Sequence, residues 1–270
     1  MNANGARPFL APALLSLLCA AAAACVTPGT FGPRDSGGVY MILAVKADAA
    51  ALEGAVRNAS QVIETRCAYL GVYCNVEREG GEGSDRLRLR VSGAQDVARV
   101  KAVLLAEGKL ELRPVVSLSS PAPLTTYLTR EAAEQAAGAR YDVAPYEEEG
   151  VGTAYLVVER EPVVTGLDLR DATAMSLTGD EAADYQINFT LRPEGAARFG
   201  AWTGANVGRY IAIVLNGKAR SAPYIKGQIT DTGQINGNFN RQQAEDIALT
   251  LKSGNMPAPI EVLEEGSYKP

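Results

Sequence analysis

The chain has 270 residues, of which 47% are hydrophobic and 21% charged, and its formal net charge at pH 7 is -5. This composition is typical of a globular protein with one large or two smaller domains, and the lack of a basic excess argues against nucleic acid as a partner. The chain has no histidine, which excludes Ser-His-Asp, Cys-His and HExxH sites. We therefore expect no catalytic residue, no cofactor and no metal.

Residues 1–25 predict a lipoprotein signal peptide. Arg7 precedes a largely apolar stretch at 9–18, which is too short to span a bilayer. The alanines that follow end at Cys25 and resemble a bacterial lipobox, although Ala22 stands where the pattern prefers leucine. We expect Cys25 to carry the lipid. The alternative is ordinary signal-peptidase cleavage nearby.

Residues 26–38 predict a flexible tether, because turn formers and small polar residues dominate this segment. A lipid at Cys25 and this tether would place the folded body at the membrane of the cell envelope, facing the periplasm. Val26 is not the acidic residue that retains some lipoproteins at the inner membrane, which favours the outer membrane.

Residues 39–116 predict a ferredoxin-like base with the order βαββαβ. Helical periodicity marks 52–70 and 97–104, and strand-like runs or alternation of apolar residues mark the four strands. The expected strands are 39–45, 72–77, 86–91 and 109–116. Helices would cover one face of the resulting sheet.

Cys67 and Cys74 are the two cysteines that remain if the signal peptide is removed and Cys25 is lipidated. In an oxidising compartment this even pair predicts a disulfide. Two buried thiols that pack as small hydrophobic groups are the alternative, because spacing does not reveal the distance between the two Cα atoms.

Arg86, Arg88 and Arg90 share one face of the expected strand 86–91. A solvated sheet face with Glu77 and Glu79 opposite across the hairpin is the favoured interpretation. A docking strip for an acidic partner is the alternative.

Residues 117–239 predict an inserted α+β head subdomain. A short helix is expected at 129–138, strands at 153–164 and 184–191, and a helix that begins at Pro193 and ends before Gly204. Trp202 would lie on the inner face of that helix, as a core residue or alternatively as a ligand-stacking residue. Asp168, Asp171 and Asp180 are read as solvated carboxylates rather than as an acid/base pair.

Asn216-Gly217 lies between two strand-like runs and predicts a β-hairpin, because both residues tolerate the positive φ of a type I′ turn. Pro223 lacks an N–H group, so we expect the second strand to lie near a sheet edge. An extended peptide can add to such an edge by backbone pairing. The candidate peptide-binding residues are Ile211, Ile213, Tyr224 and Ile225.

Residues 240–265 predict a C-terminal helix and strand, followed by a tail at 266–270. Asn240 is a candidate N-cap with Gln243 three residues later, and Gly254 and Pro257 follow the helix.

Several stretches resemble the periplasmic P1 region of the SecD subunit of the SecDF protein-export machinery. They include YLVVEREPVVTGLDLRDA, ANVGRYIAIVLNGKARSAPYI, GQINGNF and AEDIALTLKSGNMPAPIEVLEE. The resemblance is looser over VRNASQVIETRCAYLGVYCNVEREGGEGSDRLRLRVSGAQDVARVKAVL, and it extends from about Val39 to Glu265. It implies a ferredoxin-like base that carries a head subdomain, and in that family the head is thought to hold translocating polypeptide.

From this resemblance we expect a non-enzymatic, lipid-anchored envelope protein that binds extended or unfolded polypeptide in support of translocation or secretion. SecD continues after P1 into a membrane bundle with proton-conducting carboxylates. No such segment precedes Pro270 here, so a stand-alone lipoprotein is expected. The alternative is a structural adaptor that docks onto a folded envelope complex such as a SecDF-like assembly.

Overall fold

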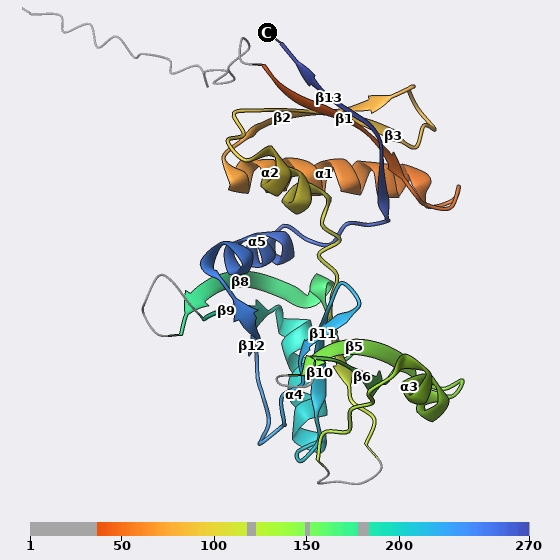
Figure 1. The fold of residues 1–270 in the computed structure, drawn as a ribbon, viewed down its shortest axis with the longest axis vertical. Coiled ribbons are helices and arrows are strands. Elements are labelled where there is room, and N and C mark those ends of the chain that lie inside the picture. The colour runs from red at the N-terminus through yellow and green to blue at the C-terminus, as the bar shows by residue number, and fades with distance from the viewer. Residues whose placement is uncertain (1–36, 118–122, 149–151, 178–183, 270) are drawn as a thin grey trace, which may run out of the picture. The chain divides into compact units, whose positions relative to one another are not determined.

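The computed structural model describes residues 37–117, 123–148, 152–177 and 184–269 (Figure 1). The expected signal peptide, Cys25, Asp180 and the tether up to residue 36 lie outside this part of the chain. The described residues form a mixed α+β structure, as expected.

The base is a four-stranded antiparallel sheet in the order β13-β1-β3-β2, with α1 and α2 on the same side of it (Figure 1). Its core is formed by apolar residues of the strands and of both helices, among them Leu43, Leu89, Ile63 and Leu104. This strand order and helix placement give a ferredoxin-like βαββαβ unit. The elements are β1 (Gly38–Val45), α1 (Leu52–Leu70), β2 (Tyr73–Glu79), β3 (Arg86–Ser92), α2 (Val97–Leu105) and β13 (Ile260–Tyr268).

The fourth strand of the base differs from the sequence-based expectation. Residues 109–116 contribute β4 (Leu110–Pro114), which pairs with β10 and β7 in the head and not with the base. The fourth base strand is β13, paired with β1 from Gly38 opposite Tyr268 to Val45 opposite Ile260. The assignment of 109–116 to the base was therefore wrong, and the head is inserted between α2 and β13.

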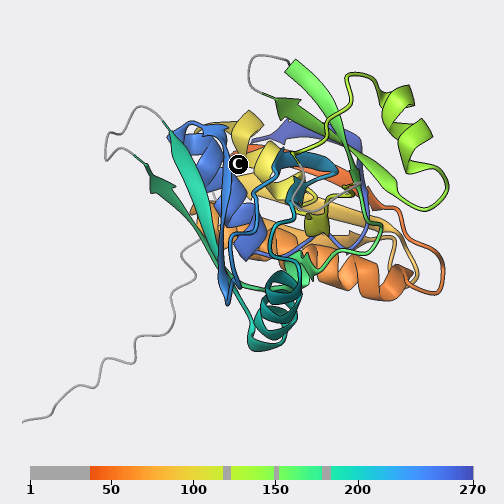
Figure 2. The ribbon, with the colours of Figure 1, turned by 90° about the horizontal axis from the view of Figure 1, so that it is seen from below.

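The head contains two sheets. A six-stranded sheet has the order β6-β5-β11-β10-β4-β7, and a three-stranded sheet has the order β12-β9-β8. The three-stranded sheet and α3 lie on opposite sides of the head (Figure 2). The elements are α3 (Arg130–Ala137), β5 (Asp142–Glu148), β6 (Gly152–Val158), β7 (Val164–Thr165), η1 (Gly166–Asp168), β8 (Leu169–Ser176), β9 (Tyr185–Leu191), α4 (Pro193–Ala205), β10 (Ile211–Leu215), β11 (Lys218–Ser221), β12 (Thr232–Phe239) and α5 (Arg241–Lys252).

The head core joins both sheets to α4 and α5. Leu112 of β4, Phe189 of β9, Phe199 of α4 and Leu251 of α5 belong to one buried cluster. The expected C-terminal segment is thus divided, because α5 packs in the head whereas β13 belongs to the base. The α5 helix begins with the expected capping box, in which Asn240 Oδ1 accepts from Gln243 N–H and Gln243 Oε1 accepts from Asn240 N–H.

Arg66 connects the two chain segments that run between base and head. Its side chain is fully buried, and Nη1 donates to the carbonyl oxygens of Val103, Leu104 and Ala106 at the end of α2. Nη2 and Nε donate to Gly254 O and Ser253 Oγ after α5, both at 3.0 Å. Burial lowers the pKa of Arg66 to about 10, so the guanidinium stays charged at neutral pH. The negative ends of two helix dipoles stabilise this charge.

Cys67 and Cys74 form a disulfide in the structure, with 6.1 Å between their Cα atoms. Cys67 lies in the last turns of α1 and Cys74 near the start of β2, and Gly71 ends the helix with a φ of 68°. This resolves the two sequence-based alternatives in favour of the disulfide over a pair of buried thiols. In the part of the chain that the structure describes, no helix combines the length and apolar character needed to cross a membrane.

Candidate functional site

The expected peptide-binding edge is not an edge. Ile211 and Ile213 lie in β10, which pairs with β4 on one side and β11 on the other, and only 2% and 3% of these residues is exposed. The Ile225 N–H donates to Arg209 O, and the Ile211 N–H donates to Pro223 O. Tyr224 is 39% exposed and its ring meets Tyr210 edge to face, whereas Ile225 is buried.

This part of the site prediction was therefore wrong, although the hairpin was right. Asn216 and Gly217 have φ values of 50° and 76° and form the turn between β10 and β11. All five residues of β10 are buried. A continuous apolar run is typical of a strand covered on both faces, and this signal outweighs Pro223, which lies beyond the end of β11.

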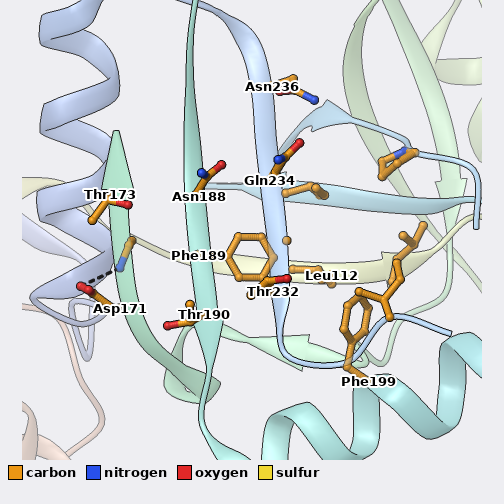
Figure 3. Close-up of a pocket in the computed structure, with 16 residues that line it drawn as sticks. Leu112, Asp171, Thr173, Asn188, Phe189, Thr190, Phe199, Thr232, Gln234 and Asn236 are labelled. Atoms are coloured by element: carbon orange, nitrogen blue, oxygen red, sulfur yellow. Dashed lines mark hydrogen bonds between the residues drawn. The ribbon is translucent and has the colours of Figure 1, made fainter. Parts of the chain in front are cut away.

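The head contains a cleft of about 610 Å³ beside β12 (Figure 3). Its apolar lining includes Leu112, Phe189, Phe199, Ile211 and Ile213, and each of these is at most 3% exposed. Neutral polar side chains form the more accessible part of the lining: Thr173, Asn188, Thr190, Thr232, Gln234 and Asn236. Two of the predicted peptide-binding residues thus reach the cleft, through their side chains and not through a free strand edge.

Strand register explains how the polar residues come together. Asn188 of β9 lies opposite Thr173 of β8 and Gln234 of β12, so these three side chains share one face of the sheet. Gly233 lies opposite Phe189 on the other face. A Cβ atom at Gly233 would lie 2.2 Å from Phe189 Cζ, so only glycine allows the Phe189 ring to lie against this strand.

The cleft is electrically neutral. Asp171 is the one charged residue among those that the structure places in its lining, and Lys252 Nζ lies 2.9 Å from its Oδ1. The hydrogen bond from Lys252 lowers the pKa of Asp171, so the pair is ionised at neutral pH.

Asp168 and Asp171 do not form an acid/base pair. Arg198 Nη2 donates to Asp168 Oδ1 at 2.6 Å and the Thr165 N–H donates to Oδ2 at 2.9 Å, whereas Asp171 is held by Lys252. Among the residues described, no group of three or more His, Cys, Asp or Glu side chains is arranged to hold a metal ion. Trp202 is partly buried against the head core, in agreement with the core interpretation.

The three arginines of β3 lie on the open face of the base sheet. Glu79 pairs with Arg88, and the register places Glu77 opposite Arg88 and Glu79 opposite Arg86. On the same face, the strands β1 and β13 lie on the side of β3 away from β2. There the Tyr40 hydroxyl donates to Glu264 Oε1 at 2.6 Å, and that hydrogen bond raises the pKa of Tyr40. Acidic groups flank the arginine row on both sides, which supports a solvated face over an anion-binding strip.

Comparison with known proteins places these features in a family. Residues 142–258 match the family described as SecDF, P1 head subdomain. The protein translocase subunit SecD of Aquifex aeolicus is 34% identical over 213 residues, which are 79% of this chain and 39% of that protein. The corresponding subunit of Koribacter versatilis is 36% identical over 221 residues, which are 80% of this chain and 39% of that protein. Residues 142–258 are thus similar to the P1 head subdomain of SecDF, and the chain is homologous to part of SecD.

Two solved SecDF structures extend the likeness to the fold. The crystal structure of SecDF in a super-membrane-facing form has a TM-score of 0.65 and 26% identity, and the match covers 89% of this chain and 32% of that one. A structure of SecDF described as a membrane component that enhances protein export has a TM-score of 0.63 and 27% identity, over 83% of this chain and 98% of that one. The chain spans about two fifths of the length of the curated SecD relatives it matches.

The sequence analysis did not predict the strands β5, β8 and β12 or the buried Arg66. The β12 strand was not expected, because its sequence TGQINGNF is rich in glycine and asparagine, which are depleted in strands. Arg66 was also missed, although a signal was present. It lies three residues after Ile63 and four before Leu70, on the apolar stripe of α1, where a charged side chain needs buried partners.

Proposed function

We propose that this chain takes part in protein translocation by binding extended or unfolded polypeptide in the cleft of its SecD P1-like head. The role is non-enzymatic and needs no cofactor. The observation that carries the proposal is a neutral cleft that joins apolar residues, amide and hydroxyl groups and the outer strand of a sheet. Backbone pairing and apolar contacts depend little on sequence, so many different uncharged segments are expected to bind.

The proposal is tested by measuring binding of the purified full chain to chemically unfolded secretory proteins by fluorescence anisotropy. The same secretory proteins in their folded form serve as the control. We expect binding of the unfolded form alone. No association at high micromolar concentration, or equal binding of the folded form, contradicts the proposal.

We also propose that Cys25 carries a lipid and holds the folded body at the envelope membrane, facing the periplasm, with the outer membrane favoured. The support is the alanine run before Cys25 and the non-acidic Val26 after it. Labelling of cells with a palmitate analogue should mark the wild-type chain and not Cys25→Ala, and density-gradient fractionation should place the wild type in the outer membrane. A wild-type chain that carries no palmitate label and is released from the membrane would instead support ordinary signal-peptidase cleavage.

A structural adaptor is the second candidate, and the open base face favours it. This face forms a hollow of about 860 Å³ lined by Tyr40, Arg86, Arg90 and Glu264 among others, a pattern suited to a folded partner with matching charges. Photo-crosslinkers placed at Arg90 and at Gln234 separate the two functions. One stoichiometric partner at Arg90 supports an adaptor, whereas heterogeneous nascent chains at Gln234 support polypeptide binding.

A further inference from the structure

We infer that the outer edge of β12 is the docking strand of the cleft, where an uncharged extended segment pairs backbone to backbone with Thr232 and Gln234. This inference rests on the proposed function, because it specifies how polypeptide is held. Within the described part of the chain, β12 pairs with β9 alone, and β11 lies close to it without pairing.

The hydrogen-bonding pattern shows which backbone groups are free to pair. The Leu191 N–H donates to Asp231 O at 2.7 Å, so Asp231 directs its carbonyl group toward β9. Residues alternate in an antiparallel ladder, and Gly233 and Ile235 therefore also face β9. Thr232 and Gln234 direct their N–H and C=O groups away from β9. Both residues are exposed and both line the cleft (Figure 3).

Local sequence keeps this edge accessible to another backbone. At Gly233 the Phe189 ring fills the space that a side chain would take, so this residue places no side chain between Thr232 and Gln234 at the edge. The β12–β9 register shifts between Ile235 and Phe239, and Asn238 adopts a φ of 50°. The regular edge is therefore short, and an incoming strand would pair over about three residues.

The neutrality of the cleft favours an uncharged peptide segment. Its one charged lining residue, Asp171, is paired with Lys252. A charged side chain brought into the cleft would lose water without gaining a counterion, whereas threonine, serine or valine would not. The segment that fits is extended, uncharged and rich in β-branched residues.

The test compares two variants of one residue in the full-length protein. The probe is a fluorescein-labelled peptide of alternating threonine and valine with blocked ends. Gln234→Pro removes the outward N–H and leaves the bonds to β9 intact, and Gln234→Ala removes the side chain alone. We expect Gln234→Pro to weaken binding about tenfold or more and Gln234→Ala to change it less than about threefold. Equal affinity of Gln234→Pro and the wild type overturns the inference.

A second measurement keeps the inference falsifiable if Gln234→Pro fails to fold. The same peptide with methyl groups on alternate backbone nitrogens lacks the donors that strand pairing needs, and we expect the wild-type protein to bind it about tenfold more weakly. Two such peptides are needed, one methylated at the odd and one at the even residues. Undiminished binding of both peptides overturns the inference. Unfolded secretory protein is measured in parallel. If the wild type binds unfolded secretory protein but neither peptide test gives the expected loss of affinity, the docking strand alone is wrong. If the wild type binds neither the peptide nor the unfolded protein, the proposed function fails as well.

Discussion

The base has one sheet face without a covering layer, and the head has a strand, β12, at the end of its three-stranded sheet. The side chains around these two surfaces differ in charge. On the open base face, acidic and basic side chains alternate and neutralise one another, as in the Arg88–Glu79 pair. In the head, the accessible strand edge at β12 is neutral and lies beside apolar residues. The base is further constrained by a disulfide and by the buried Arg66. The two regions therefore differ in charge and in constraint: the base carries paired charges and a disulfide, whereas the head carries a neutral strand edge.

The strongest test of this comparison removes the residue that connects the two regions. Arg66→Met should lower the free energy of unfolding by about 3–5 kcal/mol, because carbonyl groups at the ends of α2 and α5 lose their buried donor. Urea denaturation followed by circular dichroism measures the change. Arg57→Met, an exposed arginine of the same helix, is the matched control and should change stability by less than about 0.5 kcal/mol. A small effect of Arg66→Met would contradict the connecting role.

The disulfide should stabilise the base by a smaller amount. Its cysteines are seven residues apart, and closing so short a loop in the unfolded chain contributes about 2–3 kcal/mol. Reductant should therefore lower the urea midpoint of the wild type and leave the Cys67→Ala/Cys74→Ala variant unchanged. An equal response of both proteins to reductant would show that the disulfide does not contribute.

A substitution at Gly233 tests the packing of the head. Gly233→Ala would place a Cβ against the buried Phe189 ring and should cost about 1–3 kcal/mol of stability. Gly227→Ala is the matched control, since a Cβ there meets nothing within 4 Å. Thermal melts of both variants measure the difference. Equal melting temperatures would mean that the Phe189 ring can move, and the cleft would then be more adaptable than the structure indicates.

The smallest effect concerns the pH dependence of the head. Burial opposes ionisation of Asp168, but the hydrogen bonds from Thr165 and Arg198 outweigh it and lower the pKa of this carboxyl group. Its stabilising contribution is therefore present at neutral pH, above the pKa of the unfolded chain, and is lost as pH falls through the lower folded-state pKa. Asp168→Asn should cost about 1 kcal/mol or less at pH 7, and the difference from the wild type should shrink in acid. A constant difference across pH in urea titrations would contradict this assignment.

Much of the local structure was predictable from the sequence. Apolar periodicity predicted α1, and Pro193 and Asn240 correctly marked the starts of α4 and α5. Asn216-Gly217 predicted the β10–β11 hairpin. These signals act within a few residues, because caps and turns depend on local dihedral angles and hydrogen bonds.

Only the tertiary structure decided which strands meet. The pairing of Gly38 with Tyr268 joins the two ends of the described chain. It makes β13 the fourth strand of the base, a position that the sequence pattern had assigned to residues 109–116, which pair in the head instead. Both segments alternate similarly, so local patterning does not distinguish them. The same holds for β10, whose run of apolar residues predicted a strand but not its neighbours. It also holds for the cleft, which is lined by residues of several strands that lie far apart in the sequence. Strand partners depend on which distant surfaces bury each other, and no short stretch of sequence contains that information.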